Sequence, residues 1–87
     1  MKELLTKLNE AYEILSKLSG GHSGEFLSAE EFSEALKNKI KEIEKGNKKA
    51  IKEIYYWFAP TCEWDDFVTE NNNELGNTIF ELLEKYK

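Results

Sequence analysis

The chain has 87 residues, of which 40 % are hydrophobic and 33 % charged, and its formal net charge is −5. No apolar run approaches the roughly 20 residues of a membrane span, and the acidic balance disfavours long-range attraction to DNA or to an anionic membrane. A single cysteine, Cys62, excludes an internal disulfide, and no cysteine–histidine spacing indicates a zinc site.

The first predicted helix runs from about Lys2 to Leu18 and contains neither glycine nor proline. Its apolar residues have the spacing of an amphipathic helix. They are Leu4, Leu5, Leu8, Ala11, Tyr12, Leu15 and Leu18. The amino-terminal residues never form the apolar core of a signal peptide, so we expect a cytoplasmic protein. Residues 19–24, rich in glycine and serine, predict a flexible connector.

The second helix has the best-marked start in the sequence. Ser28 is a good N-cap, and Glu31 three residues later completes a capping box. Leu27 before the cap and Phe32 after it are placed to form a hydrophobic staple. The buried stripe consists of Phe32, Leu36, Ile40 and Ile43, flanked by Ala35. Gly46 is the predicted C-terminal cap.

Asn47 is placed to cap a third helix, which Pro60 would end because proline disfavours an α conformation at the preceding residue. The predicted inward residues are Ala50, Ile51, Ile54, Tyr55 and Phe58. Within 61–69, the spacing of Trp64, Phe67 and Val68 indicates a short helical turn.

Residues 70–73, one glutamate and three asparagines, predict a turn that caps the last helix. That helix would bury Leu75, Ile79, Leu82, Leu83 and Tyr86. No stretch shows the two-residue alternation of a strand. The sequence therefore predicts an all-α fold, a compact bundle of four main helices with a short extra helical turn before the last, as one helical domain over 1–87.

The charges are segregated along the chain. Residues 1–60 hold ten lysines and ten carboxylates, whereas 61–84 hold no lysine and carry −7; Lys85 and Lys87 bring the sum to −5. The acidic residues are Glu63, Asp65, Asp66, Glu70, Glu74, Glu81 and Glu84. A lysine-rich block opposes them with Lys37, Lys39, Lys41, Lys45, Lys48, Lys49 and Lys52. We expect the molecule to be a charge dipole.

Aromatic residues lie among the acidic ones, an arrangement that suits binding to a basic protein surface. Carboxylates would steer the encounter while aromatic anchors supply binding energy. The predicted partner-binding residues are Glu63, Asp65, Asp66, Glu70, Glu74, Trp57, Trp64 and Tyr56. The alternative is a solvated acidic face that covers a core tryptophan. Tyr56 and Phe80 fall off the apolar stripes of their helices, as partner contacts or as a second packing surface.

No constellation of catalytic residues is present, so we expect neither an enzyme nor a metal or cofactor site. His22, the only histidine, lies in the glycine-rich connector, and Glu63 beside Cys62 would raise rather than lower the thiol pKa. The acidic residues lack the spacing of an EF-hand loop, and residues 20–24 lack the ending of a P-loop. The lysine block has no arginine to recognise guanine, so we expect no nucleic-acid binding.

The segment 55–67, Tyr-Tyr-Trp-Phe-Ala-Pro-Thr-Cys-Glu-Trp-Asp-Asp-Phe, resembles small helical immunity proteins of bacterial toxin–immunity systems, including contact-dependent inhibition and colicin-type systems. Residues 74–77, Glu-Leu-Gly-Asn, and 28–32, Ser-Ala-Glu-Glu-Phe, belong to the same resemblance. It implies a cytoplasmic protein that binds a cognate toxin, commonly a nuclease, and blocks its active site or substrate cleft. The lysine block leaves open which face meets the toxin.

Two other functions compete with this one. The first is a helical adaptor or regulatory domain, either as a single chain or as a homodimer formed through Gly76, Phe80 and Leu83. The second is a nucleic-acid binder that uses the lysine-rich face.

Overall fold

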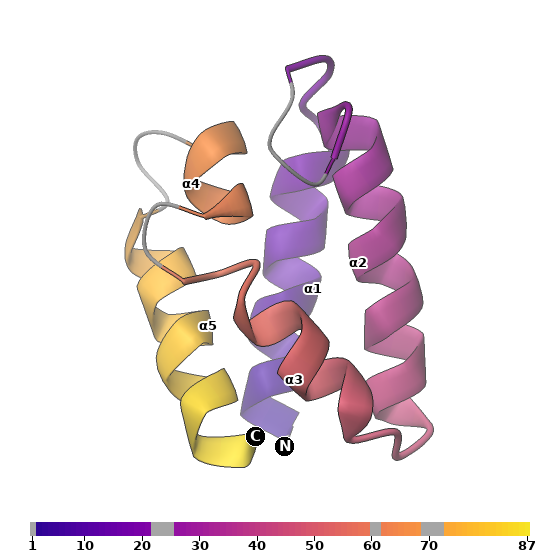
Figure 1. Ribbon diagram of the computed structural model, residues 1–87, viewed down its shortest axis with the longest axis vertical. Helices are drawn as coiled ribbons and strands as arrows, with labels where there is room; N and C mark the ends of the chain where they lie inside the picture. The colour runs from indigo at the N-terminus through magenta and orange to yellow at the C-terminus, as the bar shows by residue number, and fades with distance from the viewer. Residues whose placement is uncertain (1, 22–25, 60–61, 69–72) are drawn as a thin grey trace.

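The computed structural model describes residues 2–21, 26–59, 62–68 and 73–87, and these residues form helices without any strand (Figure 1). The helices are α1 (Lys2–Ser16), α2 (Ala29–Glu44), α3 (Lys49–Tyr55), α4 (Glu63–Phe67) and α5 (Asn73–Tyr86). The predicted all-α bundle, with a short helical turn before the last helix, is confirmed. His22, Pro60 and residues 70–72 of the predicted turn lie outside the described residues.

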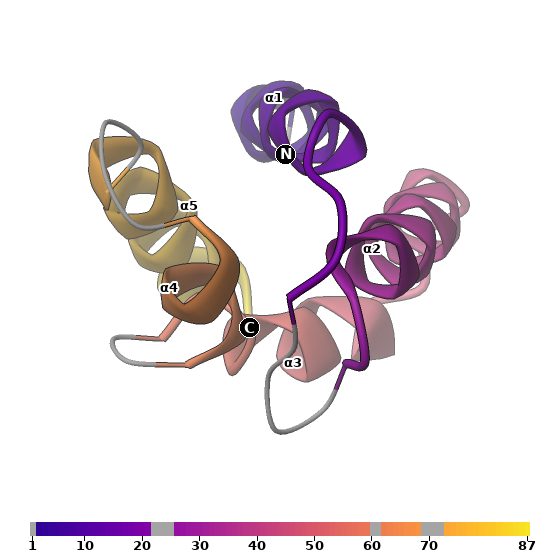
Figure 2. The same cartoon turned by 90° about the horizontal axis from the view of Figure 1, so that it is seen from above.

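The helices surround one core in a ring. Helices α1 and α2 run antiparallel, α5 lies against the other side of α1, and α3 closes the ring between α2 and α5 (Figures 1 and 2). Helix α4 packs against α5 near the amino-terminal end of α5. The described residues bury one hydrophobic cluster: Leu4, Leu8, Ala11, Leu15, Phe26, Phe32, Leu36, Ile40, Ile43, Ala50, Ile51, Ile54, Trp57, Phe58, Trp64, Val68, Ile79 and Leu83.

The first helix is shorter than its apolar pattern indicated. Helix α1 ends at Ser16, and the amides of Lys17 and Leu18 donate to carbonyls three residues back, at 3.2 and 3.1 Å, which tightens the last turn. Leu18 therefore leaves the helical stripe, and its prediction as an inward residue is wrong because it is exposed.

The start of α2 confirms the predicted cap and corrects the predicted staple. The Ser28 hydroxyl accepts the amide of Glu31 at 3.2 Å, and the Glu31 carboxylate in turn accepts the amide of Leu27 at 3.4 Å. The Leu27 side chain, however, is 79 % exposed. Phe26 takes its place, stacked on Phe32 with ring centroids 4.7 Å apart. The hydrophobic anchor thus lies one residue earlier than the staple pattern predicts.

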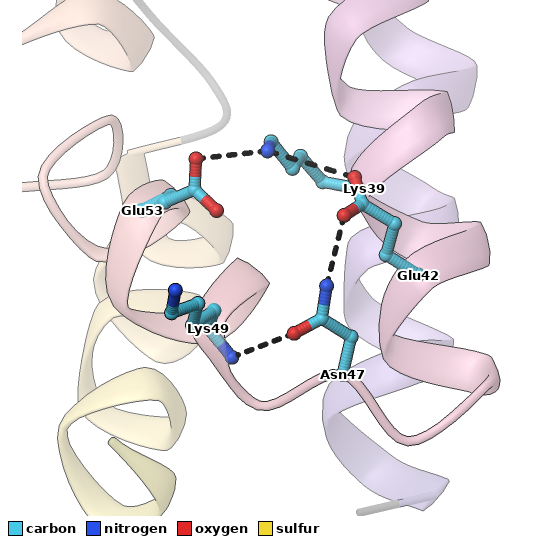
Figure 3. A network of polar contacts seen from close by, with 5 residues as sticks. All are labelled: Lys39, Glu42, Asn47, Lys49 and Glu53. Carbon is cyan, nitrogen blue, oxygen red and sulfur yellow. Dashed lines mark hydrogen bonds and ion pairs between the residues drawn. The ribbon is translucent and has the colours of Figure 1, made fainter.

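The turn between α2 and α3 is held by backbone and side-chain hydrogen bonds. Gly46, at φ +93°, donates to the Ile43 carbonyl, and the Asn47 amide donates to the Glu42 carbonyl, each at 2.9 Å. This is the Schellman arrangement, which needs a residue that tolerates positive φ. The Asn47 side-chain oxygen accepts the Lys49 amide at 3.1 Å, so Asn47 holds the start of α3 from one position before the N-cap, which is Lys48 (Figure 3).

Candidate functional site

Helix α4 has an apolar inner face and an acidic outer face. The helical spacing of Trp64, Phe67 and Val68 directs these side chains toward the core, where Trp64 and Val68 are buried. Asp65 and Asp66, the two positions between them, are exposed. The predicted short helical turn is confirmed. Because the apolar face of this helix is buried, the carboxylates on its opposite face point outward.

Trp64 fixes α4 on α5. The indole is 1 % exposed, its ring centroid lies 5.2 Å from that of Phe58, and its amide donates to the Trp57 carbonyl at 2.8 Å. A Cβ added to Gly76 would lie 2.4 Å from the indole Nε1, closer than packed atoms allow. Gly76 therefore permits the close approach of α4 to α5. Among the residues that the structure describes, none provides a hydrogen-bond acceptor for the buried Nε1.

Trp57 belongs to an aromatic cluster inside the ring of helices. It is 6 % exposed and meets Phe26 and Phe32 edge-on, at centroid distances of 5.1 and 5.6 Å. Phe67 of α4 packs against the same Phe32 at 5.6 Å. The expectation that Trp57 and Trp64 are exposed anchors is wrong for the free chain, because both indoles fill the core. They hold the acidic helix in place from within.

The carboxylates gather on two helices in contact. Asp65 and Asp66 of α4 and Glu74 in the first turn of α5 are exposed, while Glu63 is half-buried. Glu70 lies outside the described residues. Glu63, Asp65 and Asp66 all lie in the first turn of α4, where negative charge interacts favourably with the helix dipole. We call Glu63, Asp65, Asp66 and Glu74 the acidic surface.

Tyr56 lies apart from the acidic surface. It is 66 % exposed and lines a hollow of about 360 Å³ with Lys52, Tyr55, Glu84 and Lys87. Glu84 follows Glu74 by ten residues of helix, which is about 15 Å. The structure thus confirms that Tyr56 points away from the core, but places it near the opposite end of α5 from α4.

The hollow is a feature that the sequence analysis missed. Tyr55 stacks on Phe80 at a centroid distance of 4.7 Å, and its hydroxyl donates a hydrogen bond to the Glu84 carboxylate. This hydrogen bond raises the pKa of Tyr55, because the carboxylate stabilises the protonated phenol. Phe80 is accordingly a second packing surface. The only available signal was the spacing of Lys52, Tyr55 and Tyr56 on one helix.

The residues predicted to form a homodimer interface are covered, fully or in part, by other residues of the same chain. Leu83 is fully buried, Gly76 is covered by Trp64, and Phe80 is covered in part by Tyr55. The amphipathic pattern predicted the helix correctly but not that α3 and α4 cover this side of it.

The single cysteine lies at the N-terminal cap of α4 and is half-buried. Burial raises the pKa of the Cys62 thiol, and the neighbouring Glu63, Asp65 and Asp66 raise it further. The predicted effect of Glu63 is confirmed, and a thiol so held is a poor nucleophile. Within the described ranges, no three histidine, cysteine or acidic side chains gather closely enough to hold a metal ion.

The lysine-rich block divides into one tethered and several exposed side chains. Lys39 Nζ lies 2.9 Å from Glu53 and 3.5 Å from Glu42, so it joins α2 to α3 (Figure 3). The hydrogen bond to Glu53 raises the pKa of Lys39. The other members are exposed: Lys37, Lys41, Lys45, Lys48, Lys49 and Lys52. They lie on α2, on the α2–α3 turn and on α3, and α4 lies across the molecule from this turn (Figure 1).

No helix in the part of the chain that the structure describes is long and apolar enough to span a bilayer. A comparison of the sequence and structure with family models, curated proteins and solved structures finds no match.

Proposed function

We propose that the chain is a cytoplasmic immunity protein that binds a cognate bacterial toxin domain, in particular a basic nuclease domain, and neutralises it. The observation that carries the proposal is the acidic surface, three of whose four carboxylates are exposed on two helices packed together. The resemblance of residues 55–67, 74–77 and 28–32 to helical immunity proteins supports it.

The packing of α4 gives the acidic surface a fixed shape. Trp64 against Gly76 and Phe67 against Phe32 hold the inner face of the helix. Carboxylates on a held helix lose little conformational freedom when they pair with lysine or arginine, so more of the interaction energy becomes binding energy. A nuclease cleft that binds phosphates presents such cationic side chains, and the acidic surface would occupy it in place of the nucleic acid.

One standard interface reaches both the acidic surface and Tyr56. Such an interface covers about 800 Å² on each partner, against a total accessible surface of 5340 Å² here. The separation of about 15 Å between the two ends of α5 lies within an area of that size. Tyr56 replaces the two tryptophans as the candidate aromatic anchor.

The binding test compares two variants of equal charge change. Asp65→Lys with Asp66→Lys reverses the centre of the acidic surface, and Glu13→Lys with Glu34→Lys makes the same change at exposed positions of α1 and α2. Each purified chain is used to capture proteins from a lysate of the cells that produce it. We expect wild type and the Glu13/Glu34 variant to capture a basic toxin domain, and the Asp65/Asp66 variant to lose it.

Equal capture of the same toxin domain by both double variants would contradict the placement of the interface. Capture only of proteins without toxin activity would contradict the function. Circular dichroism of the two variants checks that both retain the helical fold.

A further inference from the structure

We infer a second interaction surface, on α3 and the carboxyl-terminal end of α5, that binds an acidic protein segment carrying one aromatic or large apolar side chain. We call it the tyrosine–lysine face, and it consists of Lys48, Lys49, Lys52, Tyr55, Tyr56, Glu84 and Lys87. It shares Tyr56 but no carboxylate with the toxin interface proposed above, and its test uses a peptide in place of a toxin, so the inference does not depend on toxin binding.

The hollow in the tyrosine–lysine face has rigid aromatic walls. Tyr55 is fixed by its stacking on Phe80, by its hydrogen bond to Glu84 and by the Lys87 ammonium, which lies 4.3 Å from the ring centroid. Tyr56 meets Tyr55 edge-on at 5.3 Å and is 66 % exposed. An aromatic or large apolar side chain that entered this hollow of about 360 Å³ would contact both rings.

The cationic side chains of this face are available to a ligand. Lys48, Lys52 and Tyr56 recur at four-residue spacing, so the lysines lead along α3 to the hollow. Among the described residues Lys48, Lys49 and Lys52 form no ion pair, and all three are exposed.

The neighbouring carboxylates are already engaged. Glu84 accepts the Tyr55 hydroxyl, and Glu53 accepts Lys39 on the side of α2. Ammonium groups beside occupied carboxylates favour a ligand that brings its own negative charge.

A short acidic protein segment fits these features better than a nucleic acid does. Three of its four lysines, Lys48, Lys49 and Lys52, lie at the N-cap of α3 and within this seven-residue helix, which is about 10 Å long. A longer polyanion would extend beyond them toward a molecule of net charge −5. The face also lacks arginine, the side chain best suited to bidentate phosphate contacts.

The test is an NMR titration of the full-length, isotope-labelled chain with a short peptide of glutamates around one central phenylalanine. We expect saturable shifts confined to the amides of residues 48–56 and 84–87. Tyr56→Ala should weaken the binding about tenfold, as truncation of an aromatic hot spot does. Lys52→Glu should weaken it several-fold, whereas Lys37→Glu, the same charge change on α2, should leave it unchanged.

Three results would each overturn the inference. The first is the absence of saturable shifts at millimolar peptide, and the second is equal binding of a peptide in which alanine replaces phenylalanine. The third is tighter binding of a single-stranded oligonucleotide than of the peptide on the same residues. Tyr56 is exposed and Lys52 forms no ion pair with any residue that the structure describes, so both variants should fold, and the dispersion of their spectra verifies this.

Discussion

At the scale of single residues, the contact between Gly76 and Trp64 determines where the acidic helix lies. An indole at 1 % exposure needs space, and the missing side chain at position 76 provides it. Within the described residues no group accepts the buried Nε1–H, and a buried donor without an acceptor costs about 1–3 kcal/mol. The position of Asp65 and Asp66 thus depends on a glycine in a different helix.

Gly76→Ala should therefore destabilise the protein although alanine is the better helix former. The gain in helix propensity is about 1 kcal/mol. A Cβ at 2.4 Å from Nε1 forces the indole to move, and overpacking of this kind costs about 1–3 kcal/mol or more. Urea unfolding should show a net loss, whereas Asn77→Ala, at the exposed next position, should change little. A Gly76→Ala protein as stable as wild type would contradict this packing.

Glu30 makes a hydrogen bond whose contribution to the stability of the fold depends on pH. Its carboxylate accepts the Gly20 amide at 3.0 Å, and this hydrogen bond lowers the pKa of Glu30. A carboxyl with a lowered folded pKa stabilises the fold above its unfolded pKa of about 4.3, and the contribution is lost as the pH falls through the lower folded value.

Glu30→Gln should accordingly reduce the urea midpoint at pH 7, and the difference from wild type should shrink progressively below about pH 4.3. Glu34→Gln, on the exposed side of α2, is the control at each pH. A difference between wild type and Glu30→Gln that stayed constant down to pH 2 would show that the charge of Glu30 does not act through this contact.

At the scale of elements, the helices could be predicted where burial repeats every three or four residues. The stripes of α2 and α5 and the Ser28 cap follow from local sequence alone. The aromatic cluster could not, because Phe26, Trp57 and Phe67 meet Phe32 only after α2, α3 and α4 have packed. The same limit explains why Trp57 and Trp64, predicted as partner anchors from the acidic residues around them, fill the core instead.

The start of α2 offers a matched pair of truncations. Phe26→Ala removes a buried ring stacked on Phe32 and should cost about 3–5 kcal/mol of unfolding free energy. Leu27→Ala removes a side chain that is 79 % exposed and should cost under about 0.5 kcal/mol. Chemical unfolding of both variants measures the difference. A larger loss of unfolding free energy for Leu27→Ala than for Phe26→Ala would contradict this packing and would support a staple between Leu27 and Phe32.

At the scale of the whole molecule, charge segregation follows from the order of the elements. The acidic surface lies on α4 and the first turn of α5, and the lysine-rich block lies on α2, α3 and the turn between them, so the ring of helices places these two groups apart (Figure 1). The sequence could predict this dipole because each charge block is continuous along the chain. It could not predict that Tyr56 belongs with the lysines, since the hollow forms only where α3 meets α5.

We propose that the acidic surface neutralises a nuclease-type toxin. The most direct measurement is the nuclease activity of the captured toxin domain, titrated with increasing amounts of this chain. We predict stoichiometric inhibition by wild type and by the Glu13/Glu34 variant, and a much weaker effect of the Asp65/Asp66 variant. Full nuclease activity in the presence of excess bound wild-type chain would contradict the claim.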